Sequence, residues 1–104
     1  MTRGTTPLHT FTFPEQVSNY RNIVITYRQN NELKLSKGLD DLDLEENTAK
    51  LRLTTEETLL FDPMEKGFVQ VKVLTQDNLV EASPVYSFSV NSILDETSIV
   101  PVNI

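Results

Sequence analysis

The 104-residue sequence contains no cysteine and no tryptophan, and it has a single histidine. Without cysteine the chain can form no disulfide bond, and it offers no thiol chemistry and no thiolate zinc site. One histidine without cysteine also leaves too few ligands for a transition-metal site. The absence of tryptophan counts against a carbohydrate-binding function without excluding it. We therefore expect no cofactor and no bound metal.

Long apolar runs and clustered glycines are also missing. No apolar run approaches the ~20 residues that a membrane-spanning helix needs. Residues 1–7 lack the charged region followed by an apolar stretch that is typical of a secretory signal. Gly4, Gly38 and Gly67 are isolated, so the sequence offers no glycine-rich loop for a phosphate group. We expect a protein that is made in the cytoplasm and does not insert into a membrane.

Positive charge is scarce, with nine Lys and Arg against fifteen Asp and Glu and a formal net charge of −6. Such a chain repels a phosphate backbone, so we expect no nucleic-acid partner. Five acidic residues gather in one stretch, at Asp40, Asp41, Asp43, Glu45 and Glu46. Their spacing lacks the glycine and glutamate positions of a helix–loop–helix calcium site. We expect a strand over residues 41–45 with a solvated, charged edge, and we regard calcium binding as the weaker interpretation.

The strongest pattern in the sequence covers residues 68–90. Apolar and polar residues alternate over 68–75 and again over 86–90, on either side of a polar turn at residues 76–78. Alternation of this kind is typical of a half-buried strand, and two such runs around a short turn predict a hairpin. The residues expected to face inward are Val69, Val71, Val73, Tyr86, Phe88 and Val90.

Four more segments alternate in the same way, at residues 9–13, 22–29, 32–36 and 48–53. Asn30-Asn31 separates two of them and predicts a tight turn, because Asn tolerates a positive φ. The resulting hairpin is expected to place Leu33 and Leu35 inward. The other residues expected to share one face of a strand are Ile23, Ile25 and Tyr27, and then Ala49, Leu51 and Leu53.

A helical signal interrupts the strands at Thr54-Thr55-Glu56-Glu57. Threonine followed three residues later by glutamate is typical of a capping box, with Thr54 as the N-cap. Adjacent glutamates at a helix start point apart, so we do not interpret them as the converging carboxylates of a glycosidase. Pro63 is expected to stop the element. We predict one or two helical turns that close one end of the core.

These elements together predict an all-β fold, an immunoglobulin-like antiparallel β-sandwich of about seven strands with one short helical turn before the last hairpin. A small barrel is the alternative. The predicted organisation is a flexible N-terminal lead (residues 1–8), a single β-sandwich domain (residues 9–94) and a C-terminal tail (residues 95–104). The tail is apolar around Pro101, and two interpretations stay open: a mobile terminus, or a segment that docks onto a neighbouring subunit.

The residues do not predict an enzyme. His9 has no nucleophile or carboxylate at a recognisable spacing, so we do not expect it to act as a catalytic base. The aromatic residues on strands are expected in the core more than in a sugar-stacking platform. The candidate interaction residues are Tyr20, Tyr27, Ile99, Val100, Val102 and Ile104.

Several segments resemble a known family. The opening Met-Thr-Arg-Gly-Thr-Thr-Pro-Leu-His-Thr-Phe-Thr-Phe-Pro resembles the start of small prophage-encoded proteins of Firmicutes, and residues 25–29, 53–58 with Phe61, and 69–75 share the likeness. The predicted sandwich is similar to the N-terminal domain of siphophage baseplate upper proteins. This resemblance implies a role beside phage structural proteins and implies no catalytic residues.

We therefore expect a non-enzymatic phage or prophage structural or assembly protein, associated with the tail or baseplate, that acts through protein–protein contacts. Its expected partners are other phage structural proteins or further copies of itself. It is expected in the bacterial host cytoplasm during synthesis, with the virion as a later location. The alternative is a monomeric module that binds the cell surface or a carbohydrate.

Overall fold

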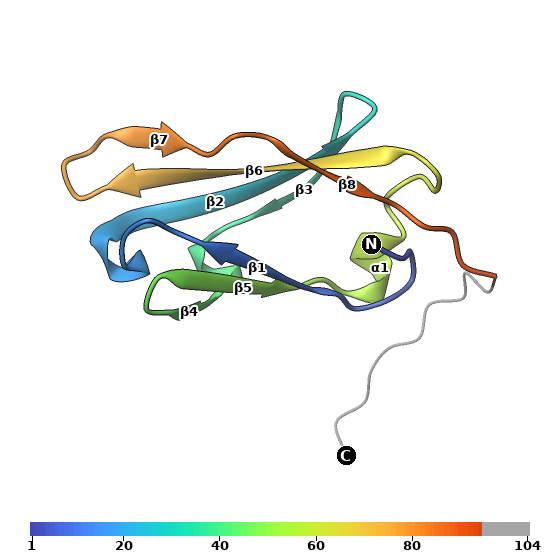
Figure 1. The fold of residues 1–104 in the computed structure, drawn as a ribbon, viewed down its shortest axis with the longest axis horizontal. Helices are drawn as coiled ribbons and strands as arrows, with labels where there is room; N and C mark the ends of the chain where they lie inside the picture. The colour runs from blue at the N-terminus through green and yellow to red at the C-terminus, as the bar shows by residue number, and fades with distance from the viewer. Residues whose placement is uncertain (95–104) are drawn as a thin grey trace, which may run out of the picture.

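The computed structural model describes residues 1–94, so the tail and its four candidate residues, Ile99, Val100, Val102 and Ile104, lie outside the described part. The strands are β1 (Leu8–Thr12), β2 (Tyr20–Gln29), β3 (Glu32–Lys37), β4 (Asp43–Glu45), β5 (Thr48–Arg52), β6 (Lys66–Thr75), β7 (Val80–Ala82) and β8 (Tyr86–Ser89). The helical turns are η1 (Val17–Asn19), η2 (Leu39–Asp41) and α1 (Thr55–Thr58). These elements form an all-β sandwich of two antiparallel sheets (Figure 1).

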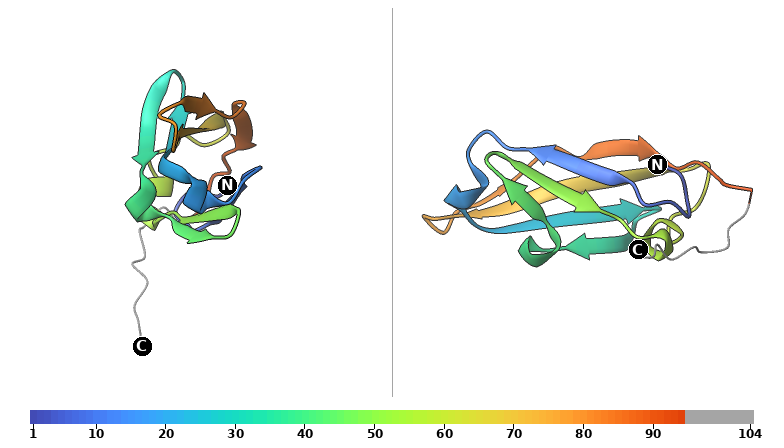
Figure 2. Two further views of the ribbon diagram at one scale, coloured as in Figure 1. Left: turned by 90° about the vertical axis from the view of Figure 1, so that its left-hand side faces the viewer. Right: turned by 90° about the horizontal axis from the view of Figure 1, so that it is seen from below.

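One sheet has the strand order β1-β5-β4. In the other, β3, β2 and β6 lie side by side, and both β7 and β8 pair with the remaining edge of β6. The two layers lie one above the other in Figure 1, and the view from below looks onto their faces (Figure 2). The predicted sandwich is therefore confirmed, and the small-barrel alternative is wrong, because the two sheets do not join in the described part of the chain.

The strand order follows that of an immunoglobulin sandwich. There, strands A, B, E and D form one sheet, and C′, C, F and G form the other. In chain order, β1, β5 and β4 occupy positions B, E and D, while β3, β2, β6 and the β7–β8 pair occupy C′, C, F and G. Within residues 1–94 no strand takes position A, beside β1. The edge of β1 that strand A would cover is consequently left open.

The core lies between the two inner faces, as the alternation predicted. Ile23, Ile25 and Tyr27 of β2 are fully buried, and they face Ala49 and Leu51 of β5 across the layers. Each apolar side chain buried in this way contributes roughly 1.5–3 kcal/mol. The described residues hold eight strands instead of about seven, because a short strand, β7, precedes β8 and is separated from it by residues 83–85.

The β2–β3 hairpin contains an irregularity that the sequence did not reveal. Asn30 and Asn31 have φ angles of 54° and 63°, which form the predicted tight turn. Tyr27 pairs with Leu35 while its neighbour Arg28 pairs with Leu33, so an extra residue sits between them in β3. The prediction that both leucines face inward is wrong for Leu33, which is 58% exposed, because this bulge reverses the alternation.

The acidic stretch forms a shorter strand than predicted. Asp41 belongs to η2, where its carboxylate accepts a hydrogen bond from the Gly38 N–H (2.9 Å), and β4 begins only at Asp43. Leu39 and Leu42 pack against the core beside it. The connection from β3 to β4 therefore runs from one sheet to the other and covers that side of the sandwich.

The predicted capping box is confirmed at α1. The Thr54 hydroxyl accepts a hydrogen bond from the Glu57 N–H (3.1 Å), and the Glu57 carboxylate accepts one from the Thr54 N–H (2.8 Å). Phe61 follows, fully buried and edge-on to Tyr27 with ring centroids 6.1 Å apart. The turn thus closes one end of the core, beside the N-terminus (Figure 1).

The start of the N-terminal lead, expected to be flexible, is hydrogen-bonded to the end of β8 and to the chain after α1. The Met1 ammonium donates to Ser89 O (2.7 Å), and the Asn91 N–H donates to Met1 O (2.8 Å). The Arg3 N–H donates to Asn91 O (3.0 Å), and its guanidinium donates to Phe61 O (2.6 Å). Residues 1–3 therefore lie along the chain that continues from β8.

Candidate functional site

A groove opens on the side of the sandwich opposite the β3–β4 connection. It lies between β1 and the β7–β8 pair, and its volume is about 700 Å³. In residues 1–94, β1 pairs only with β5, and β7 and β8 pair only with β6, so both flanking edges are free. We call this cavity the edge groove. Its volume falls within the ~300–1,000 Å³ typical of binding clefts.

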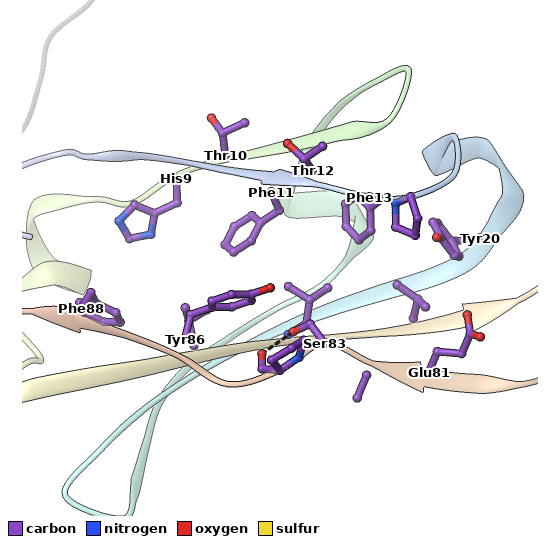
Figure 3. A pocket seen from close by; sticks show the side chains of 16 residues that line it. His9, Thr10, Phe11, Thr12, Phe13, Tyr20, Glu81, Ser83, Tyr86 and Phe88 are labelled. Carbon is purple, nitrogen blue, oxygen red and sulfur yellow. Dashed lines mark hydrogen bonds between the residues drawn. The ribbon is translucent and has the colours of Figure 1, made fainter.

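The upper wall of the edge groove comes from β1. His9 and Phe11 of β1, and Phe13 directly after it, point into the space, while Thr10 and Thr12 point away (Figure 3). This arrangement follows directly from the two-residue period of a strand. The aromatic side of β1 is therefore only partly covered by the opposite sheet.

The lower wall comes from β8. Tyr86 and Phe88 point toward β1, and Tyr86 lies at the mouth with 55% of its surface exposed (Figure 3). Phe88 lies deeper and packs edge-on to Phe61, with ring centroids 5.7 Å apart. A β carbon on Gly67 would lie 2.6 Å from Cε2 of Phe88, so the ring rests against bare backbone of β6. The wall is thus an aromatic surface held by close packing from behind.

The floor of the edge groove is aliphatic. Val69, Val71 and Val73 of β6 line it, and Tyr20 of β2 closes one end. Burial and the negative charges of Glu15 and Glu81 raise the pKa of Tyr20, so its hydroxyl stays protonated. The groove therefore presents an apolar floor, aromatic walls and a carboxylate, Glu81, near the end that Tyr20 closes (Figure 3).

His9 and Tyr27 form the main polar contact beneath the groove. His9 Nδ1 lies 2.6 Å from the Tyr27 hydroxyl oxygen. Burial, and then the N-terminal ammonium, lowers the pKa of His9, while burial and the charge of Glu57 raise the pKa of Tyr27. At neutral pH the imidazole is therefore neutral, and the Tyr27 O–H donates to Nδ1. The pair connects β1 to β2, and Glu81 lies at the other end of the groove from His9 (Figure 3).

The structure separates the candidate interaction residues. Tyr20 lines one end of the edge groove but is mostly buried, whereas Tyr27 has no exposed surface and cannot contribute to a binding platform. Phe13 is buried, as its assignment to the core predicted. The residues that sequence reasoning assigned to the core, but that line the groove with part of their surface exposed, are Phe11, Tyr86 and Phe88. Their alternation was readable. Their exposure was not, because it depends on which strands lie at the sheet edges.

The other charged candidates have structural roles. Glu57 forms an ion pair with Lys37 in addition to its capping bonds. Burial alone would raise the pKa of Glu57, but hydrogen bonds from Lys37 and Thr54, together with the Lys37 charge, hold it below its usual value. Over residues 1–94, no group of three His, Asp or Glu side chains could hold a metal ion. In the same range, none of the helical segments has the length and apolar character needed to cross a bilayer.

Comparisons with known proteins found no counterpart. No protein-family model, no curated protein and no solved structure matches this chain.

Proposed function

We propose that this protein is a non-enzymatic assembly module that binds an extended segment of another protein chain in the edge groove. The observation that carries this proposal is an apolar groove bounded by two free strand edges. A strand entering it would find backbone hydrogen-bonding groups along β1 or β8 and a floor for every second side chain. Strand addition to an exposed sheet edge is an established mode of protein recognition.

Simple energetics sets the expected strength of binding. Three apolar side chains buried in the groove would contribute ~5–9 kcal/mol, at about 1.5–3 kcal/mol each. Association costs at least ~4 kcal/mol in lost freedom of motion. The difference, at most ~5 kcal/mol, corresponds to a dissociation constant of a few tenths of a millimolar or weaker, so tight assembly would need several such contacts at once.

We further propose that this assembly takes place among phage or prophage structural proteins of the tail or baseplate. The resemblance of residues 1–14 to small prophage-encoded proteins supports this context. Mass spectrometry of purified particles from a bacterium that carries the gene tests it. Peptides of this protein at a level comparable with other tail components are expected, and their absence would remove the virion role.

Selection from a library of displayed eight-residue peptides tests the groove itself. The full chain is expected to enrich peptides in which apolar residues alternate with polar ones. Tyr86→Asp places a charge at the mouth of the groove and is expected to abolish binding. Ser87→Asp is the matched control, because Ser87 is exposed on the opposite face of the same strand. Binding that survives Tyr86→Asp would place the site elsewhere.

The second candidate function is carbohydrate binding, and the exposed ring of Tyr86 is the observation that favours it. A glycan array with the full chain decides between the two. Saturable binding of one oligosaccharide, lost in Tyr86→Ala, together with no peptide enrichment, would favour the carbohydrate-binding module.

A further inference from the structure

We propose that the occupant of the edge groove is the C-terminal segment of a second copy of this chain, residues 99–104. This inference rests on the proposed function and names its partner. The segment reads Ile-Val-Pro-Val-Asn-Ile, so Val100, Val102 and Ile104 share one face of an extended chain. Three apolar side chains two residues apart match an aliphatic floor laid by three valines with the same spacing, Val69, Val71 and Val73.

Charge also fits this occupant. The chain carries fifteen Asp and Glu and nine Lys and Arg, yet residues 97–104 contain no charged side chain. The edge groove is mainly apolar, with Glu81 as the one carboxylate in its lining. A segment without charged side chains enters such a groove without burying an unpaired side-chain charge, which most other stretches of this acidic chain would do.

Pro101 agrees with an added edge strand. In an extended chain the N–H groups of alternate residues point to the same side. If Val100, Val102 and Ile104 pair with one flanking strand, the position of Pro101 faces the other side, where its missing N–H breaks no ladder bond. Proline is tolerated in strands at such edge positions and excluded from central ones. The segment can therefore pair with β1 or with β8, but not with both.

The N-terminal residues favour a second copy over the same chain. A tail that turned back tightly against β8 would first pair with the chain near Ser89 and Asn91. Residues 1–3 already occupy that edge. Met1 O accepts a hydrogen bond from the Asn91 N–H (2.8 Å), and the Arg3 N–H donates to Asn91 O (3.0 Å). Thr2 and Asn91 also form a parallel β-bridge. Leu94, the last described residue, lies beyond this point and is fully exposed. The direct return path is thus blocked, whereas the groove of another molecule is open from the side.

Light scattering over a concentration series tests the proposal with the full chain. The average mass is expected to rise above the 11.8 kDa of one chain as the concentration increases. Val102→Asp in the segment and Tyr86→Asp in the groove are each expected to keep the protein monomeric. Asn103→Asp and Ser87→Asp are the matched controls on the opposite faces of the same strands, and both are expected to associate like the unmodified chain.

Mixing the two defective variants provides a readout that misfolding cannot imitate. Tyr86→Asp retains an intact segment, and Val102→Asp retains an intact groove. An equal mixture is therefore expected to form a complex of two chains and nothing larger, although each variant alone stays monomeric. A mixture that remains monomeric would overturn the proposal.

A strict monomer at every concentration would also overturn it. So would a monomer whose unfolding temperature falls in Val102→Asp but not in Asn103→Asp, because the segment would then occupy the groove of its own chain. The peptide selection separates this failure from failure of the proposed function. Peptides that need Tyr86, alongside a monomeric chain, would retain the groove and reject only this occupant.

Discussion

Gln29 is a fully buried polar residue at the end of β2, and its side-chain amide is hydrogen-bonded to one loop. Its side-chain N–H group donates to Asp62 O (2.9 Å) and Glu65 O (3.3 Å), and its carbonyl oxygen accepts from the Asp62 N–H (2.6 Å). The amide thus satisfies the backbone of the connection between α1 and β6. Burying a polar group costs little free energy when its hydrogen bonds are made, and it costs much more when they are not.

Gln29→Leu is expected to lower the free energy of unfolding by about 1–3 kcal/mol, because it leaves the Asp62 N–H and two carbonyl groups without their partner. Urea denaturation measures the change. Gln76→Leu, at an exposed position in the β6–β7 turn, is the control and is expected to stay within ~0.5 kcal/mol. If the free energy of unfolding of Gln29→Leu falls by less than ~0.5 kcal/mol, water replaces the amide as the hydrogen-bond partner of the loop backbone.

His9 predicts a pH dependence of stability. Its folded-state pKa lies below the ordinary value of 6.5, so the unfolded chain binds the proton more readily. Stability contributed by the neutral imidazole is therefore full above pH ~6.5 and declines as the pH falls through that value toward the folded pKa. Thermal unfolding between pH 7.5 and 5 is expected to show this decline in the unmodified chain and to lose most of it in His9→Gln.

A second, more acidic decline belongs to Glu57. Its pKa is lowered in the folded state, so its contribution is complete above the ordinary value of 4.5 and disappears as the pH falls below it. His9→Gln is expected to leave this lower transition in place. An unchanged slope between pH 7.5 and 5 in His9→Gln would show that another group governs that window.

At the scale of elements, one side chain of β8 lies closer to the backbone of β6 than a β carbon there would permit. The contact is made by Gly67 against the ring of Phe88, and that ring is in turn held by Tyr27 and Phe61. Because the ring is enclosed on these sides, a larger residue in β6 can displace it only toward the edge groove. The position of β8, and with it one wall of the groove, depends on a residue without a side chain.

Gly67→Ala is expected to destabilise the protein by ~1–3 kcal/mol, the usual cost of overpacking. Gly38→Ala is the matched control, since nothing lies within 4 Å of its added carbon and its φ is −106°. It is expected to be neutral or slightly stabilising. Denaturation curves of both variants give the comparison, and equal stability would mean that β8 moves aside without cost.

The elements also show which information the sequence carries. The inner face of β2 and the capping box of α1 were readable, because both depend on residues close in sequence. The bulge opposite Arg28 was not, since it is created by pairing between two strands. Pro84 could have suggested the break between β7 and β8, because proline interrupts a ladder. The edge groove was hidden because strand order determines which edges are free.

At the scale of the whole molecule, like charge opposes association between copies. Each chain carries a formal net charge of −6, whereas the proposed contact between segment and groove is apolar. Salt screens the repulsion between exposed charges, with a Debye length of ~30 Å at 0.01 M and ~8 Å at 0.15 M. Association is therefore expected to strengthen several-fold between these salt concentrations. Sedimentation velocity measures it, and weaker association in salt would indicate ion pairs instead of apolar docking.

The hydrogen bonds of residues 1–3 along the extension of β8 have a consequence for any assembly built through the edge groove. If each subunit places its segment in the groove of one neighbour and receives the segment of a different neighbour, the contact is heterologous. Such an assembly has two different ends. The terminal subunit at one end has an empty groove, and the terminal subunit at the other end has an unbound segment. A different protein that supplied only a groove or only a segment would stop growth of the assembly at one end. Its abundance relative to the subunit would then set the length of the assembly.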